Sequence, residues 1–153
     1  MAVKPIPDGH HTVTPYLIVK SGAQAIDFYK QAFGATEVDR VLGPGGKIMH
    51  AEIGIGDSRV MLADEFPERG IHAPGPERSS VSIMLYVNDV DAVAKQAVAA
   101  GAKIVRPVEN QFYGDRTGTL SDPFGHTWHV GTHVEDVSPE EMKKRMAAMQ
   151  PTQ

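Results

Sequence analysis

The sequence of 153 residues has no cysteine and no long hydrophobic run. Without cysteine, a disulfide scaffold, a thiolate metal site and a cysteine nucleophile are excluded, and a reducing compartment is expected. Its apolar runs have the length of strands, whereas a membrane-spanning helix needs about 20 apolar residues. The polar, proline-containing start lacks the apolar core of a signal peptide. We therefore expect a cytoplasmic protein that does not associate with membranes.

The chain also lacks an excess of positive charge. Its 15 basic and 19 acidic residues give a formal charge of -4. Nucleic-acid binding and attachment to an anionic lipid surface both depend on a concentrated positive field. Because 41% of the residues are hydrophobic and 22% are charged, the composition is that of a folded globular domain without a nucleic-acid partner.

An internal repeat organises the sequence. Phe33-Gly34-Ala35 is matched by Ala100-Gly101-Ala102, and the two glycines are 67 positions apart. A second glycine pair, Gly56 and Gly125, has an offset of 69. Two modules of similar length therefore fill most of a single domain over 1–153. Their predicted limits are about 12–65 (module 1) and 81–135 (module 2), with a linker at 66–80 and a C-terminal helix at 139–149.

Each module is predicted to contain one strand, one helix and three further strands. In module 1, Ser21 and Gln24 form a capping box pattern and Gly34 ends the helix. In module 2, Asn88 or Asp89 starts the helix. The expected strands lie at 13–19, 36–42, 47–55 and 58–64 in module 1, and at 81–87, 103–108, 116–121 and 126–133 in module 2. The predicted fold class is α+β, with two βαβββ modules.

Strand alternation separates a face covered by the helix from an open face. We expect Leu17, Met49 and Trp128 on the helix side, and His10 and His11 in solvent. The open faces would carry Tyr16, His50, Glu52, Met84, Tyr86 and His129. Such a wall, apolar and aromatic with a few polar groups, is typical of a small-molecule pocket. Ordinary cross-strand pairs on a partly wetted sheet are the alternative.

The chain resembles the vicinal oxygen chelate superfamily, which includes glyoxalases, bleomycin-resistance proteins and extradiol dioxygenases. The resemblance covers about residues 12–135, and its strings are most similar to the PhnB-like branch. They are Thr14-Pro15-Tyr16-Leu17, Ala25-Ile26-Asp27-Phe28-Tyr29, Met49-His50-Ala51-Glu52, Gln111-Phe112-Tyr113-Gly114-Asp115-Arg116 and Asp122-Pro123-Phe124-Gly125-His126. The resemblance implies a cup-shaped curved sheet, commonly in a homodimer.

The resemblance also implies four metal-ligand positions, which fall on Thr14, Val60, Ser82 and His129. Only His129 is a suitable ligand, because valine cannot coordinate and neutral hydroxyls bind weakly. We therefore expect no metal cofactor. A substitute divalent site built from His50, Glu52 and His129 is the alternative, and a Glu52–Arg116 charge pair is another possible role for that carboxylate.

The leading hypothesis is a metal-free protein that binds an apolar or planar small molecule. Tyr16, Tyr86, Phe112 and Tyr113 would stack on the ligand, beside Met84, and a loop at 107–118 would form a lip over the cup. His50, Glu52, Arg116 and His129 would orient its polar groups. The alternatives are a metal-dependent lyase, isomerase or dioxygenase, and a structural or regulatory dimer with an empty cup.

Overall fold

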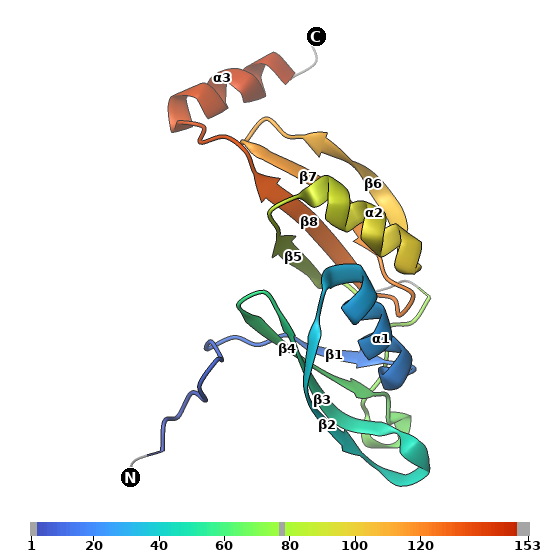
Figure 1. Ribbon diagram of the computed structural model, residues 1–153. Coiled ribbons are helices and arrows are strands. Elements are labelled where there is room, and N and C mark those ends of the chain that lie inside the picture. The colour runs from blue at the N-terminus through green and yellow to red at the C-terminus, as the bar shows by residue number, and fades with distance from the viewer. Residues whose placement is uncertain (1–2, 77–78, 150–153) are drawn as a thin grey trace.

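The two predicted modules are present, and they have the same order of elements (Figure 1). The computed structural model describes residues 3–76 and 79–149, so the ends of the predicted domain and residues 77–78 of the predicted linker lie outside the described residues. Module 1 contains β1 (Tyr16–Val19), α1 (Gly22–Phe33), β2 (Thr36–Leu42), β3 (Ile48–Ile55) and β4 (Ser58–Asp64), with short 3-10 turns η1 (Pro44–Gly46) and η2 (Pro67–Arg69). Module 2 contains β5 (Ser82–Tyr86), α2 (Val90–Ala100), β6 (Lys103–Asn110), β7 (Asp115–Ser121) and β8 (Thr127–His133), followed by α3 (Pro139–Met149).

Each module forms its own four-stranded sheet. The strand orders are β1-β4-β3-β2 and β5-β8-β7-β6, and in each sheet the first strand runs parallel to its neighbour while the other pairs are antiparallel. The helices α1 and α2 lie side by side and cover the same side of the molecule (Figure 1). The α+β prediction is confirmed, and the repeat in the sequence corresponds to a repeat in the fold.

A carboxylate from β4, not the predicted capping box, supports the start of α1. The Ser21 side chain makes no capping hydrogen bond. The Asp64 carboxylate accepts hydrogen bonds from the backbone amides of Gly22 (2.8 Å) and Ile48 (2.7 Å). A Cβ atom on Gly22 would lie 2.7 Å from the Ile48 side chain, so only glycine lets the helix approach β3 this closely. In α2, the predicted cap is present, because Asp89 accepts from the Ala92 amide (3.1 Å).

The two modules share one hydrophobic core. An aromatic cluster crosses the boundary between them, with ring centroids 5.4 Å apart for Tyr29 and Trp128 and 4.6 Å apart for Phe33 and Trp128. Phe28 of α1 also contacts Phe124 of module 2 edge to face. Since the helix sides of both sheets are used for this packing, the hydrophobic driving force joins the modules through their helices.

A buried carboxylate, Asp122, is hydrogen-bonded at the centre of this cluster. It accepts from the Tyr29 hydroxyl (2.6 Å) and from the Trp128 indole (2.9 Å). It also accepts from the backbone amides of Phe124 (2.8 Å) and His126 (2.9 Å), so the turn after β7 is held as well. Burial, together with the nearby Asp122, raises the pKa of Tyr29 well above its ordinary value, so Tyr29 remains a donor. Asp122 therefore connects α1 of module 1 to β8 of module 2.

A bulge in β3 changes one predicted orientation. Val41 is opposite His50 and Leu42 is opposite Ile48, so Met49 is the extra residue. Ile48 is fully buried beneath α1, whereas Met49 is half-buried and borders a depression on the open face together with Tyr16. The prediction that Met49 faces the helix is wrong, because the bulge breaks the alternation on which it was based.

The role of Asp122 can be measured by its replacement. Asp122→Asn should lower the free energy of unfolding by about 2–4 kcal/mol, because an amide cannot accept all four hydrogen bonds and a buried donor is left unpaired. Tyr29→Phe should lower it by about 1 kcal/mol, since it removes only one of these bonds. The measurement is urea unfolding followed by the fluorescence of Trp128, the single tryptophan.

Asp27→Asn, at an exposed position on α1, is the matched control and should leave the midpoint unchanged. Equal stability of the Asp27 and Asp122 variants would contradict the role given to Asp122.

Candidate functional site

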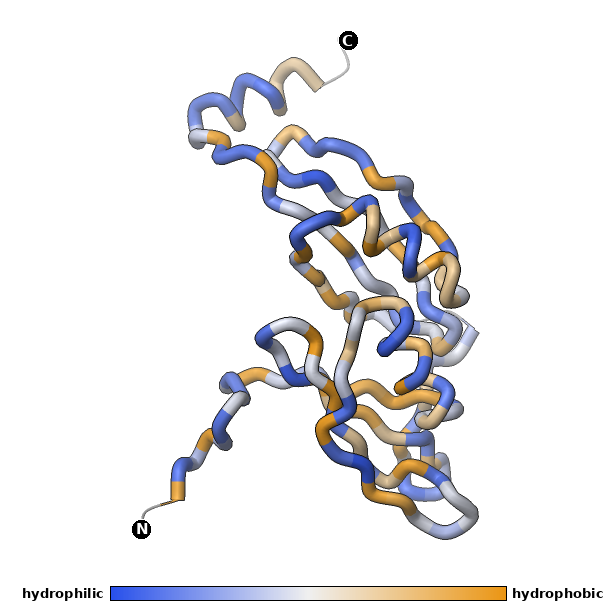
Figure 2. Tube along the Cα trace, in the orientation of Figure 1, coloured by the Kyte–Doolittle hydropathy of each residue, from blue (hydrophilic) through white to orange (hydrophobic). Residues whose placement is uncertain are grey.

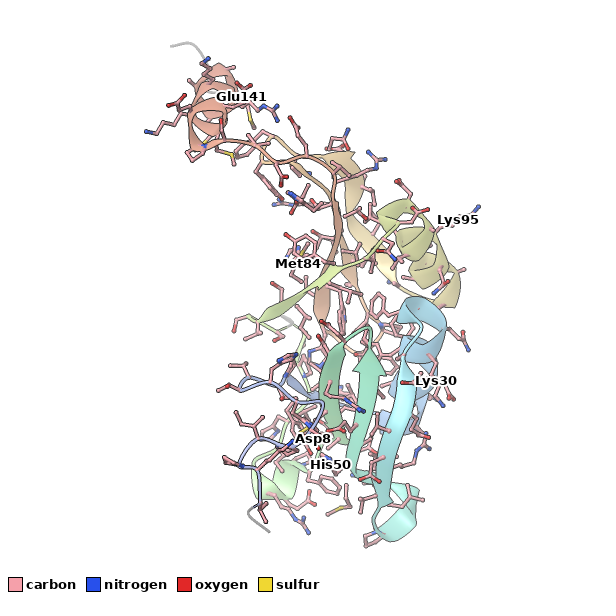
Figure 3. The ribbon with its side chains drawn as sticks, turned by 60° about the vertical axis from the view of Figure 1, so that its left-hand side comes forward. Asp8, Lys30, His50, Met84, Lys95 and Glu141 are labelled. Atoms are coloured by element: carbon pink, nitrogen blue, oxygen red, sulfur yellow. The ribbon has the colours of Figure 1, made fainter. Side chains whose placement is uncertain are left out.

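The faces of both sheets opposite the helices form the candidate site. Figure 3 shows Lys30 of α1 and Lys95 of α2 on one side of the molecule and Met84 of β5 on the other. Strand register fixes which residues share the open faces. In module 1, Met61 of β4 is opposite both Tyr16 of β1 and Glu52 of β3, so these three residues share a face. In module 2, Met84 of β5 is opposite His129 of β8.

The open face of module 1 is partly covered by the segment 3–13, here called the N-terminal arm. His10 of the arm lies 2.5 Å from the Glu52 carboxylate through its Nε2 atom, and Arg59 approaches the other carboxylate oxygen at 3.8 Å. The expectation that His10 is solvated is wrong, because only 14% of its side chain is exposed. The Glu52 carboxylate therefore has one partner from the N-terminal arm and one from module 1.

His50 and Tyr16 form a second polar pair on module 1. The Tyr16 hydroxyl and the His50 Nδ1 atom are 2.8 Å apart, and their rings lie 5.6 Å apart between centroids. Partial burial raises the pKa of Tyr16. In Figure 3, Asp8 of the N-terminal arm lies on the same side of the molecule as His50. This face therefore presents paired polar groups around an exposed tyrosine ring.

On module 2, His129 lies at the centre of the open face. Its Nδ1 atom is 3.0 Å from the Thr119 hydroxyl and its Nε2 atom is 3.0 Å from the Ser82 hydroxyl. Both hydroxyls can donate or accept, so the neutral ring is satisfied in either tautomer. The imidazole is therefore held by one partner on β7 and one on β5, the two strands that flank β8.

A polar cavity of about 450 Å³ opens beside His129. A second hollow of about 500 Å³ lies between β1 and β5 and is more apolar, with Val13, Tyr16, Val81 and Met84 in its wall. Ser82 borders the second hollow and is hydrogen-bonded to His129 of the first. The polar cavity is lined by Arg106, Pro107, Glu109, Gln111, Tyr113, Thr117, Gly118, Thr119 and His129.

Two irregularities in β6 produce the wall of the polar cavity. Ile104 is opposite Leu120, but Arg106 is opposite Thr119, so one extra residue shifts Arg106 to the open face. A second shift between Arg106 and Glu109 brings Glu109 to the same face. Pro107 lies within this second irregularity. Because the strand pairing is interrupted there, the absence of a backbone N–H group on proline removes no hydrogen bond between the strands. Arg106 and Glu109 are site residues that the sequence analysis missed.

A network of hydrogen bonds surrounds Asp115 at the far end of the same face. Its carboxylate accepts from the Tyr86 hydroxyl (2.7 Å) and lies 2.7 Å from His133 Nδ1, while His133 Nε2 lies 2.7 Å from Asp136. The hydrogen bonds to Asp136 and to Asp115 raise the pKa of His133. The hydrogen bonds from Tyr86 and from His133 lower the pKa of Asp115. This network fixes the Tyr86 ring on the open face and holds the segment after β8.

The prediction of a loop over 107–118 is wrong for most of that range, because β6 extends to Asn110 and β7 begins at Asp115. Only residues 111–114 form the lip, and the same segment anchors it. Gly114 accepts backbone hydrogen bonds from Val134 (2.9 Å) and Glu135 (3.0 Å). Arg145 of α3 donates to the Phe112 carbonyl (3.0 Å) and is paired with Glu135 (2.7 Å). Phe112 packs edge to face on Tyr113, which lines the polar cavity. The lip is therefore positioned by α3, which Figure 2 shows to be largely hydrophilic until its last residues.

Arg116, a predicted ligand-binding residue, faces the helices and not the open face. Arg116 forms a two-pronged ion pair with Asp91 of α2 (2.8 and 2.9 Å) and also donates to Asn110 (3.2 Å). The hydrogen bonds between them raise the pKa of Arg116 and lower that of Asp91. Since Arg116 lies on the helix side of β7, the predictions that it lines the cup or pairs with Glu52 are wrong.

The residues present do not fit the metal site that the superfamily implies. Val60 belongs to the hydrophobic core, and Ser82 supplies only a neutral hydroxyl. Within residues 3–76 and 79–149, no three histidine or carboxylate side chains converge on one point, so His50, Glu52 and His129 do not form a substitute site. One imidazole is too small a donor set for a tightly held divalent ion.

Comparison with known proteins places the chain in a family. The model of the glyoxalase/bleomycin resistance protein/dioxygenase superfamily matches residues 9–130. An uncharacterized protein of Mycobacterium tuberculosis is 41% identical over 140 residues, which cover 89% of this chain and 82% of the relative. The chain therefore belongs to the glyoxalase/bleomycin resistance protein/dioxygenase superfamily.

Two solved structures share the fold of this chain. The crystal structure of TioX from Micromonospora sp. ML1 has a TM-score of 0.66 at 26% identity, with 81% of this chain and 99% of that chain covered. The structure of a gene product from Arabidopsis thaliana has a TM-score of 0.66 at 30% identity, with coverage of 78% and 97%.

No helix within the described residues is both long and apolar enough to cross a bilayer.

The His133 network should make stability depend on pH. Because the pKa of His133 in the folded protein is raised above 6.5, its ion pairs stabilise the fold fully below that value, and this contribution is lost as the pH rises through the raised pKa. Wild type should therefore melt at a higher temperature than His133→Gln at about pH 6, and the difference should shrink by about pH 9. Thermal unfolding measures this, and an NMR titration giving a His133 pKa at or below 6.5 would contradict it.

Proposed function

We propose that the protein binds a small molecule in a cup formed by the open faces, without a metal ion, as a member of the PhnB-like branch. The observation that carries this proposal is the polar cavity of about 450 Å³ beside the apolar hollow, since together they have the size and mixed lining of a ligand site. The strings in the sequence that resemble the PhnB-like branch support the finer assignment.

Three exposed side chains give the cup its apolar surface. Tyr86 is 61% exposed, Tyr16 is 47% exposed and Met84 is 40% exposed, all on faces opposite the helices. Aromatic rings and a flexible thioether pack well on a planar ligand. Phe112 and Tyr113 of the lip would close one end of the site, and the His50–Tyr16 and His129–Ser82 pairs would orient polar groups of the ligand.

We further propose that a second copy of the chain completes the cup. The sheets of the two modules are separate, and β1 and β5 each pair along one edge only. Val13 and Val81, beside these edges, are 82% and 69% exposed, which leaves apolar surface and unpaired strand edges together. In the proposed homodimer, the open face of module 1 of one protomer meets the open face of module 2 of its partner. This contact would cover both the apolar surface and the unpaired strand edges.

Ligand binding can be tested with N-phenylnaphthylamine, a neutral planar dye that fluoresces on entering an apolar site. We expect saturable binding to the wild type, weakened about tenfold by Met84→Gln, because one apolar contact of about 1.4 kcal/mol is removed. Met146→Gln, at a half-exposed methionine of α3, is the matched control and should bind as the wild type does. Absence of saturable binding would contradict the proposal.

The dimer can be tested by sedimentation equilibrium. The wild type should sediment with twice the mass of one chain, whereas Val81→Asp should shift the equilibrium toward the single chain, since a charge would be buried in the interface. Val98→Asp, at an exposed position of α2, should leave the mass unchanged. A single-chain mass for the wild type at micromolar concentration would contradict the completed cup.

A further inference from the structure

We infer that the polar cavity recognises an acidic group on the ligand, with Arg106 as the anchoring cation. The ligand class is a small organic acid, with a carboxylate, sulfonate or phosphonate on a planar or apolar body. This inference rests on the proposed function and adds to it the chemistry of one end of the site.

The first observation is the state of Arg106 itself. Within residues 3–76 and 79–149, no carboxylate oxygen lies within 4.0 Å of its guanidinium. Several other arginines of the chain are paired with carboxylates in that range: Arg40, Arg59, Arg116 and Arg145. A guanidinium presents a planar fork of donors that matches the oxygens of an acid, and here that fork lines a cavity.

The second observation is the set of groups around Arg106. Thr117 and Tyr113 supply hydroxyl donors, and the side chain of Gln111 supplies an amide, whereas the Thr119 hydroxyl is hydrogen-bonded to His129. These groups come from β7 and from the lip, so the donors surround the cavity from more than one side. Neutral donors beside a cation satisfy the remaining lone pairs of a bound acid without adding charge.

Glu109 and Arg106 give the cavity a negative and a positive end. Its carboxylate lines the same cavity as Arg106 without pairing with it. An acidic group of the ligand is therefore favoured at the Arg106 end and disfavoured beside Glu109. Since His129 connects the cavity through Ser82 to the apolar hollow, the rest of the ligand can lie along Met84.

The bulges of β6 make this arrangement specific to the fold. Regular alternation would place Arg106 with Ile104 on the helix side, away from the cavity. The bulge turns Arg106 to the open face, and the close approach of Gly118 to Val108 allows it, since a Cβ on Gly118 would lie 2.8 Å from the Val108 side chain. Both the strand register and this glycine thus maintain a cation in the cavity.

The test uses two dyes that differ in one acidic group. Anilinonaphthalene sulfonate carries a sulfonate on the ring system of N-phenylnaphthylamine, which lacks it. Arg106→Gln should weaken binding of the sulfonate about tenfold, the effect of losing one charge-assisted hydrogen-bonded pair, and should leave the neutral dye within about twofold. Arg106→Lys should be intermediate, because it keeps the charge but not the fork.

Two further variants separate a specific contact from the general field of the protein. Lys103→Gln makes the same charge change on the same strand, outside the lining of the polar cavity, and should leave both dyes unaffected. Glu109→Gln should keep or strengthen binding of the sulfonate. Phenylphosphonate should displace the sulfonate dye from the wild type, which shows that the acid group and not the dye is recognised.

The outcomes of these experiments distinguish acid recognition by Arg106 from the proposed ligand binding in the cup. Binding of the neutral dye together with equal loss of the sulfonate dye in Lys103→Gln and Arg106→Gln would overturn the role of Arg106 and leave the ligand site in place. Failure of the wild type to bind either dye would overturn both. Selective loss of the sulfonate dye in Arg106→Gln alone supports both.

Discussion

The arrangement of the molecule depends on one buried carboxylate. Asp122 accepts hydrogen bonds from Tyr29 of module 1 and from Trp128 of module 2, inside an aromatic cluster that excludes water. A carboxylate buried in this way is tolerated because its lone pairs are occupied, and its loss leaves donors unpaired on both modules. The modules are consequently joined through their helix sides, and the opposite faces of both sheets remain available to a ligand or a partner.

The chemistry of those faces is decided by departures from regular strand geometry. In β3 a bulge turns Met49 away from the helix, and in β6 two irregularities bring Arg106 and Glu109 to the open face. Each strand thereby presents on the open face residues that regular alternation would have turned toward the helices. The result is an open face with an apolar part near Met84 and a polar part near His129, which suits a ligand that has an apolar body and a polar group.

The fold could be predicted from the sequence because its signals are local and repeated. The paired glycines, the helical spacing and the turn residues give the element order, and the structure has strands and helices close to the predicted limits. The residues of the site could be predicted only where alternation holds, as at Tyr16 and His129. Bulges depend on pairing with a neighbouring strand, so Arg106 was missed. The partners of His10 and Arg116, respectively Glu52 and Asp91, are 42 and 25 residues away in sequence, and nothing local indicates them.

The proposed acid-binding cavity faces away from the helices and lies beside an apolar hollow. Its most direct test is chemical-shift mapping of the amide NMR spectrum during a titration with phenylphosphonate. We expect saturable shifts centred on Arg106, Thr117, Thr119 and His129, with the α1 and α2 amides unaffected. Shifts centred on another basic surface, such as that around Arg59 or Arg69, or no shift at all, would contradict it.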